Sequence, residues 1–289
     1  FGGNEKFDLH GAIDDATGKV VGLYMTKHEC LHGYLEITRQ MLLKHGIPVN
    51  IYADRHTIFR SPKADKLALE EQLEGKQVKL TQFQRAMDEL GVVIIPARSP
   101  QAKGRVERLW ETLQSRLPVE FKIAGITTVE EANEFLINYI DKFNEKYAVA
   151  PENPETAFRS LRDTVDIDNI LCVKVNRCTD NGSIFSYANK HFMVICEDKE
   201  VIIPPRASVD VLISTRFGIR AMYKGKAFDV IPYVIPKRKQ KAPLKTRKVY
   251  RPPDDHYFKY GHELWTKLSY AESNDEIMEM LEDIFLKKY

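Results

Sequence analysis

The segment Lys27–His32 contains a residue pattern that is typical of zinc hydrolases. His28, Glu29 and His32 read H-E-x-x-H. On a helix, this spacing puts two imidazoles one turn apart as zinc ligands, with the glutamate beside them as general base. The longer pattern, with a glycine and a third histidine ligand, is absent, since Gly33 follows His32 directly. A zinc hydrolase is therefore a remote alternative, and we expect His28 and His32 to be surface residues on the helix that supports the sheet.

Two carboxylates stand where an open α/β sheet places its ligands. Asp54 ends the apolar segment VNIYAD, and such sheets bind ligands at the carboxyl ends of their strands. Glu107 lies one turn into a predicted helix that follows the strand segment VVIIPARSP, so it can project back toward the same end of the sheet. Carboxylate oxygens are ligands that magnesium prefers. For either acid taken alone, a solvated surface acid or a helix-start acid is the favoured interpretation.

The elements that position these acids follow from apolar periodicity. The segments KFDLHGAID and GKVVGLYM predict a hairpin, with its turn at Asp15–Gly18. An apolar stripe from Leu31 predicts a helix that ends at His45 and Gly46. The strand VNIYAD, a helix at Thr81–Leu90 and the strand VVIIPA predict a parallel crossover, and a further helix runs through KGRVERLWETLQSRL. The first half is thus a predicted mixed α/β sheet with flanking helices.

The second half of the sequence changes character. After a predicted helix at Val129–Lys146, short alternating runs separated by Asp, Asn, Gly and Pro predict a small all-β barrel or sandwich. We place domain boundaries that give an α/β domain at residues 1–162, a β-barrel-like domain at 163–235, and a basic linker with a helical tail at 236–289.

Composition narrows the class of protein. The chain has 289 residues and 43% hydrophobic content, enough for a folded core. It lacks an apolar run of the length that a membrane-spanning helix needs and a signal-like N-terminus, so we expect a cytoplasmic protein that does not bind membranes. Its four cysteines are too irregularly spaced for a disulfide framework or a metal knuckle.

Positive charge is concentrated in one tract, although the net charge is only +2. Such a tract suits a polyanion such as DNA, while a solvated linker is the alternative. Its basic residues are Lys237, Arg238, Lys239, Lys241, Lys245, Arg247, Lys248 and Arg251.

The motifs around the two acids resemble a known family. The segments YADRHTIFR and SPQAKGRVERLWETLQSRL, with the hairpin GAIDDATGKVVGLYM upstream, resemble the catalytic core of DDE transposases, which are related to retroviral integrases. The similarity is closest to insertion-sequence transposases of the ISNCY type, and it extends to KYAVAPENPETAFRSL and FSYANKHFMVI. It therefore covers nearly the whole chain.

The resemblance implies a fold and a mechanism. It implies an RNase H-like core in which three acids bind two divalent ions, Mg²⁺ or Mn²⁺, for DNA cleavage and strand transfer. Asp54 matches the second acid and Glu107 the third. The first acid is expected upstream of Phe1, and Asp8 is the only weak candidate within the chain.

Other residues take secondary roles under the same resemblance. Lys103, Arg105, Arg108 and His56 are expected to contact DNA, together with the basic tract. The expected partners are element ends and target DNA, with the protein acting as a homo-oligomer near the nucleoid. The principal alternative is a catalytically inactive DNA-binding or assembly protein of the same fold.

Overall fold

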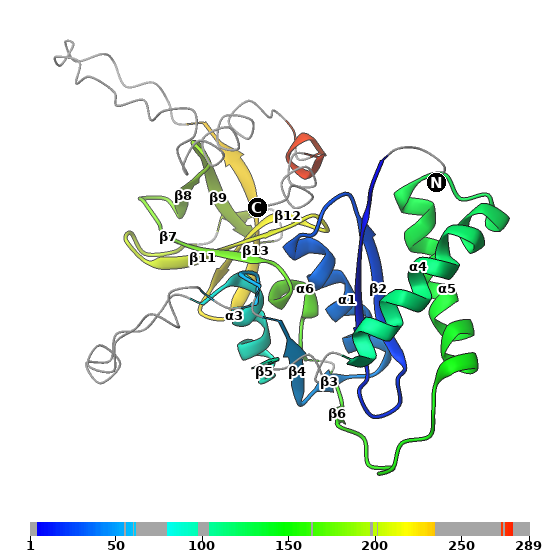
Figure 1. Ribbon diagram of the computed structural model, residues 1–289. Helices are drawn as coiled ribbons and strands as arrows, with labels where there is room; N and C mark the ends of the chain where they lie inside the picture. Colours follow the sequence, from blue (N-terminus) through cyan, green and yellow to red (C-terminus); the bar gives the residue numbers. More distant parts are fainter. Residues whose placement is uncertain are drawn as a thin grey trace. The chain divides into compact units, whose positions relative to one another are not determined.

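The computed structural model divides the chain into two compact units (Figure 1). The first unit ends at Cys172 and the second begins at Val173, and we describe each by itself. The structure describes residues 5–54, 56–59, 61, 80–97, 104–162, 164–196, 199–200, 202–234, 273 and 275–279.

The first unit begins with an antiparallel hairpin between helices. Strand β1 (Asp8–Ile13) pairs with β2 (Val20–Thr26). In the turn, Asp14 accepts a hydrogen bond from the backbone N–H of Thr17 at 3.1 Å, and Gly18 has a φ of 68°, which favours glycine. The predicted hairpin is confirmed, with its turn at the expected residues.

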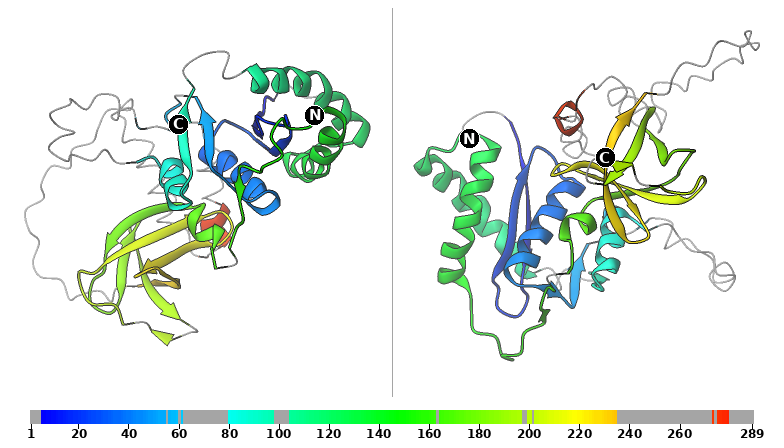
Figure 2. Two further views of the ribbon diagram at one scale, coloured as in Figure 1. Left: turned by 90° about the horizontal axis from the view of Figure 1, so that it is seen from below. Right: turned by 180° about the vertical axis from the view of Figure 1, so that it is seen from behind.

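Helices cover both faces of this hairpin. Helix α1 (Leu31–Lys44) lies on one face, while α4 (Gly104–Ala124) and α5 (Val129–Tyr147) lie on the other (Figures 1 and 2). The core between the hairpin, α4 and α5 contains fully buried leucines such as Leu23, Leu113 and Leu136. Helix α1 ends at His45 and Gly46 as predicted, and the φ of Gly46 is 100°. The shared core therefore holds α4 against the two strands of the hairpin.

The outer edge of β2 is closed by side-chain amides rather than by another strand. Asn144 bonds both the N–H and the C=O of Val20, at 2.8 Å each. Asn133 does the same at Met25 (2.7 and 3.0 Å), and Gln40 at Leu23 (3.0 and 2.9 Å). These amides satisfy backbone groups that a neighbouring strand would otherwise satisfy. Strand β2 is therefore an edge strand, whereas the far edge of β1 has no partner strand within the described ranges.

A second, parallel pair of strands carries the first candidate acid. Strand β4 (Asn50–Ala53) pairs in parallel with β5 (Val93–Pro96), and α3 (Gln82–Glu89) lies between them in the sequence. The predicted parallel crossover is thus confirmed. Its core also includes α1 and α6 (Ile167–Ile170). Two very short strands, β3 (Ile47–Pro48) and β6 (Phe158–Arg159), form a separate antiparallel pair that the sequence pattern did not predict.

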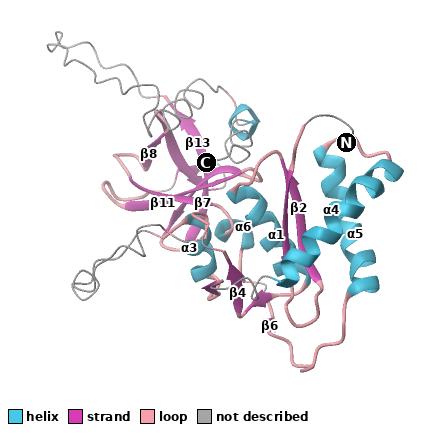
Figure 3. Cartoon of the chain, in the orientation of Figure 1, coloured by secondary structure: helices cyan, strands magenta, loops and turns pink. Residues whose placement is uncertain are grey.

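The second unit is an antiparallel, barrel-like sheet (Figure 3). Its strand order is β10-β9-β13-β12-β11-β7, and β8 pairs with β9. The predicted β-rich, barrel-like half is confirmed. The strands are β7 (Val173–Cys178), β8 (Ile184–Tyr187), β9 (Lys190–Cys196), β10 (Lys199–Glu200), β11 (Ser208–Ser214), β12 (Gly218–Tyr223) and β13 (Lys226–Tyr233).

None of the described helices is both long enough and apolar enough to span a membrane. The chain is a mixed α/β unit followed by a β unit.

Candidate active site

Asp54 occupies the position that the sequence predicted, directly after a parallel strand. Ala53 is the last residue of β4, and its carbonyl accepts a hydrogen bond from the N–H of Ala97 after β5, at 2.8 Å. The Asp54 Oδ1 atom accepts the N–H of His56 at 3.0 Å, an interaction that closes a tight turn. Asp54 is exposed. Its carboxylate thus retains free acceptor positions at the end of the strand.

An aromatic cluster anchors the loop that follows Asp54. Phe59, at the end of this loop, is buried against two aromatic rings. Its ring centroid lies 4.7 Å from that of Tyr34 on α1 and 5.1 Å from that of Phe83 on α3, both in edge-to-face geometry. Such pairs add to the free energy gained from burial alone. The loop is therefore fixed to two helices.

Tyr34 links this loop to the beginning of α1. Its hydroxyl donates a hydrogen bond to Glu29 Oε1 at 2.6 Å. Burial, this hydrogen bond and the negative charges of Glu29 and Asp54 together raise the pKa of the Tyr34 phenol. Tyr34 is consequently a neutral donor at all physiological pH values.

β1 supplies two side chains to the same region. Asp8 Oδ2 accepts the backbone N–H of Glu29 at 2.6 Å, and His10 Nε2 accepts that of Cys30 at 3.2 Å. The His10 ring also packs edge-to-face on Tyr34 at 4.7 Å. Gly33 permits this approach, since a Cβ there would lie 2.4 Å from His10 Nδ1. Asp8 therefore has a structural bond, which gives no support to its role as the first acid.

His10 is held in its neutral form. Burial is the largest influence and lowers its pKa, against the opposing influence of the Tyr24 carbonyl and the nearby acids Glu29 and Asp8. Because Nε2 accepts a hydrogen bond from Cys30, it carries no proton in this arrangement.

Glu107 lies in the first turn of α4, as the sequence predicted. It is exposed, as is its neighbour Arg108. An open hollow in the surface beside it is lined by Gly104, Glu107, Arg108, Trp110, Glu111 and Gln114. A carboxylate at the start of a helix is favoured by the helix dipole. Glu107 is thus accessible to a ligand.

The first turns of α4 dock on the hairpin. Trp110 packs so closely on β1 that a Cβ at Gly11 would lie 2.7 Å from its ring. Trp110 is therefore a packing residue of α4. Arg105 Nε lies 3.3 Å from Asp15 Oδ1 in the hairpin turn. Arg105, a predicted DNA contact, is therefore also an exposed ion-pair partner.

Within the described residues, Asp54 and Glu107 are not connected by any interaction. No hydrogen bond or ion pair links Asp54 with Glu107, and no group of three or more His, Cys, Asp or Glu side chains in the described ranges is arranged to hold a metal. Lys103 and the basic tract at residues 237–251 lie outside the described residues. Their predicted DNA contacts stay predictions.

The H-E-x-x-H segment does not form the arrangement that zinc needs. Helix α1 begins at Leu31, so His28 and Glu29 precede it and the two histidines are not one helical turn apart. Glu29 accepts the Tyr34 hydroxyl, and the His32 ring packs on Tyr24 at 5.6 Å. His28 is exposed as expected, whereas His32 is partly buried. The expectation that both lie on the helix was wrong for His28.

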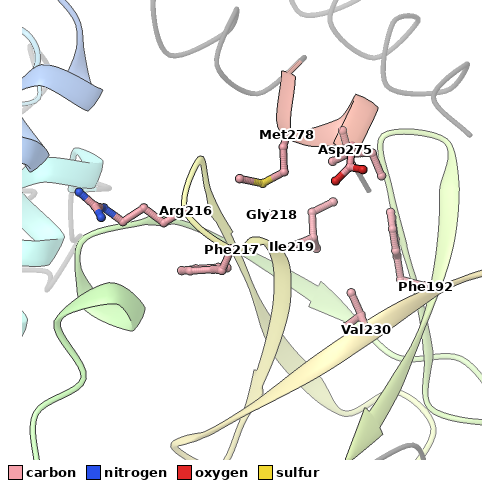
Figure 4. Close-up of a pocket in the computed structure, with 9 residues that line it drawn as sticks. Phe192, Arg216, Phe217, Gly218, Ile219, Val230, Asp275 and Met278 are labelled. Atoms are coloured by element: carbon pink, nitrogen blue, oxygen red, sulfur yellow. The ribbon is translucent and has the colours of Figure 1, made fainter. Parts of the chain in front are cut away.

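A further hollow belongs to the second unit (Figure 4). The short helix at Asp275–Glu279 covers it with Ile277, which is 3% exposed, and Met278. A Cβ at Gly218 would lie 3.3 Å from Met278 Sδ. The lining side chains Phe192, Ile219 and Val230 are apolar, so this hollow is a packing site for the chain's own helix.

Comparison with known proteins identifies relatives for nearly the whole chain. The "Transposase for insertion sequence IS1202" of Streptococcus pneumoniae is 33% identical over 269 residues, which cover 89% of this chain and 55% of the relative. The chain is a homologue of insertion-sequence transposases. The "Putative transposase y4bF" of Sinorhizobium fredii (strain NBRC 101917 / NGR234) is 36% identical over 190 residues, 65% of the chain and 39% of the relative.

This transposase homologue spans about half the length of the curated relatives it matches. No protein-family model matches it. The two relatives confirm the resemblance to insertion-sequence transposases at the level of the family.

Sequence reasoning missed the residues that support Asp54 from a distance. Tyr34 was interpreted only as part of the apolar stripe of α1, and Glu29 only as part of the zinc pattern. The available signal was a tyrosine in a core-facing stripe, because a buried hydroxyl needs a hydrogen-bond partner.

Proposed function

We propose that this chain contains the catalytic part of a transposase that cleaves DNA and transfers its strands by a DDE mechanism. The observation that carries the proposal is the position of Asp54, directly after a parallel strand, in a chain that matches a named transposase over 89% of its length. Ligands of open α/β sheets bind at that end of the strands.

The open edge of β1 supports an RNase H-like arrangement. Amides close the outer edge of β2, yet no strand of the described residues pairs with the far edge of β1 or with a second edge of β4. Helix α1 packs against both strand pairs. A strand that bears the first acid, inserted between β1 and β4, would complete a mixed sheet and bring that acid beside Asp54.

The donor atoms fit a pair of magnesium or manganese ions. Asp54 and Glu107 are exposed carboxylates with unused acceptor positions, and they would provide hard oxygen ligands. Bound ions supply an activated attacking oxygen and neutralise the leaving oxygen in phosphodiester chemistry. This chemistry requires no histidine or cysteine ligand.

The remaining side chains of the site bind and orient DNA in this proposal. Arg108, next to Glu107 on α4, would pair with a phosphate, as would Lys103 and Arg105. His56 would contact a phosphate or orient the attacking water through Nε2, since its Nδ1 accepts the backbone N–H of Ile58 at 3.4 Å. By resemblance to transposases that join two element ends within a multimer, the protein would act as at least a dimer on DNA.

The test uses a protein that contains this chain together with a strand that bears the first acid. Asp54→Asn or Glu107→Gln should abolish strand transfer in magnesium and leave DNA binding intact. Glu111→Gln is the matched control, since Glu111 lines the same hollow one turn further along α4. Normal strand transfer by either active-site variant would contradict the proposal. DNA binding without strand transfer by the unaltered protein would favour the inactive assembly protein.

A further inference from the structure

The β12–β13 hairpin of the second unit has an unusual turn. Tyr223 pairs with Lys226, so the connection has two residues, Lys224 and Gly225. Their φ angles are 49° and 78°. Two positive φ angles are typical of the tight turn that matches the twist of a hairpin, and this turn favours Asn, Asp or Gly at both positions. Lysine is an unfavourable residue for the first position.

A second two-residue turn in the described part of the sheet shows when such a residue has a packing reason. Between β8 and β9, Ala188 and Asn189 have φ angles of 48° and 61°. Ala188 is 3% exposed, so the core requires a small apolar residue there. Lys224, in contrast, is exposed, and so are Gly225 and Lys226. The packing of the described fold gives no reason for a lysine at position 224.

The two lysines form a positive tip supported by aromatic rings. Lys224 Nζ lies 5.4 Å from the ring centroid of Tyr223, and Lys226 Nζ lies 5.5 Å from that of Phe228. A cation over an aromatic face is held in place without being neutralised.

The nearby carboxylates are already engaged. Asp229 on β13 pairs with Arg220 at 3.2 Å, and Asp210 on β11 accepts a hydrogen bond from Asn176 at 3.0 Å. No ion pair is formed by Lys224 or Lys226 within the described part of the chain. The tip therefore presents two uncompensated charges, which we call the lysine tip (Lys224 and Lys226).

We propose that the lysine tip binds the phosphate backbone of duplex DNA, and this inference rests on the proposed action of the protein on DNA. Lysine is a point charge that suits a phosphate without reading sequence. Tyr223 and Phe228 are partly buried beneath the lysines, so their faces serve as supports rather than as platforms for unpaired bases. Duplex DNA fits this arrangement better than single-stranded DNA.

The test measures the salt dependence of binding of the full chain to a short labelled duplex. Each phosphate contact contributes a slope of about 0.9 in log affinity against log salt. Lys224→Asn with Lys226→Gln should therefore lower the slope by about 1.8 and weaken binding at moderate salt. Lys224→Arg keeps the charge and should bind normally.

Two measurements exclude trivial causes. Lys190→Gln removes a lysine after the β8–β9 turn, at the other end of β13, and should leave the slope unchanged. Lys224→Asn should raise the melting temperature by about 2–5 °C, because asparagine tolerates positive φ better than lysine. Weaker DNA binding by a more stable variant cannot result from unfolding.

The outcomes separate this proposal from the proposed active site. An unchanged slope in the double variant, or a loss confined to single-stranded DNA, would overturn the lysine tip alone. The Asp54→Asn variant should bind the duplex normally, since Asp54 belongs to catalysis. A complete lack of duplex binding by the unaltered chain would overturn both the lysine tip and the action on DNA.

Discussion

The two candidate acids are held in place by different means. Asp54 is fixed locally, by its own hydrogen bond to His56 and by the burial of Phe59 five residues later. The Glu107 side chain makes no hydrogen bond within the described residues, and its position follows from the packing of α4 through Leu109, Trp110 and Leu113.

The two acids therefore differ in which residues fix their positions and in how free their side chains are to bind a ligand. A carboxylate at a strand end is positioned by its loop, so damage to the loop affects it directly. A carboxylate on a helix is positioned by distant core residues, so its own side chain stays free to meet a ligand. Substitutions in the residues that hold each acid in place should therefore differ in their effects.

The loop of Asp54 depends most on Phe59. Phe59→Ala should lower the free energy of unfolding by about 3–5 kcal/mol, because it leaves a cavity between Tyr34 and Phe83. Urea unfolding measures this change. Thr57→Ala, an exposed residue of the same loop, is the control and should change stability by less than about 0.5 kcal/mol. Equal effects of the two variants would mean that Phe59 does not anchor the loop.

The hydroxyl of Tyr34 should contribute less to the free energy of unfolding than the burial of Phe59. Tyr34→Phe keeps the ring contacts but removes the hydrogen bond to Glu29, and we expect a loss of about 1 kcal/mol in unfolding free energy. Tyr52→Phe is matched chemically, and its side chain is exposed, so it should have no effect. If Tyr34→Phe has the same free energy of unfolding as the unaltered protein, the Tyr34 hydroxyl does not help to stabilise the site.

His10 should make the first unit sensitive to acid. Its pKa is lowered in the folded state, so the unfolded chain binds a proton more readily below the unfolded value of about 6.5. The stability that neutral His10 contributes is present above that pH and is lost as pH falls toward the folded pKa. His10→Gln keeps an acceptor for Cys30 and should flatten the dependence of unfolding free energy on pH in this range. An unaltered pH profile would contradict a buried neutral His10.

The pair of Arg105 and Asp15 should contribute least to stability. Its side chains are 48% and 82% exposed, and exposed pairs contribute at most about 0.5 kcal/mol when solvent screens them. Asp15→Asn should thus leave unfolding unchanged while it releases Arg105 for phosphate contact and strengthens DNA binding. Thermal unfolding and duplex binding of one protein sample check both statements. Weaker DNA binding would show that Asp15 helps to place Arg105.

Local patterns predicted most of the elements. The hairpin turn at Asp15–Gly18, helix α1 and the parallel crossover around Asp54 were visible because turn residues and apolar spacing act over a few residues. Helix α4 continues to Ala124 past Pro118, beyond the predicted segment, and its later turns bury Phe121. Tertiary packing thus outweighed the proline that local rules treat as a stop.

Contacts between distant residues could not be predicted. The amides that seal β2 join residues far apart in the sequence, such as Val20 and Asn144. The fit of Gly33 against His10 and the hydrogen bond between Tyr34 and Glu29 depend on how β1 meets α1. The positions of Asp54 and Glu107 were correctly predicted on their elements, whereas the side chains that support them were identified only in three dimensions.

The proposed metal site depends most on Asp54 as a direct metal ligand. The most direct test is Asp54→Cys in a protein that contains this chain and a strand with the first acid, assayed for strand transfer in magnesium and in manganese. Magnesium binds thiolate poorly, whereas manganese accepts softer ligands. We predict no activity in magnesium and partial recovery in manganese, with Glu111→Cys active in both. Full activity of Asp54→Cys in magnesium would contradict the assignment of Asp54 as a metal ligand.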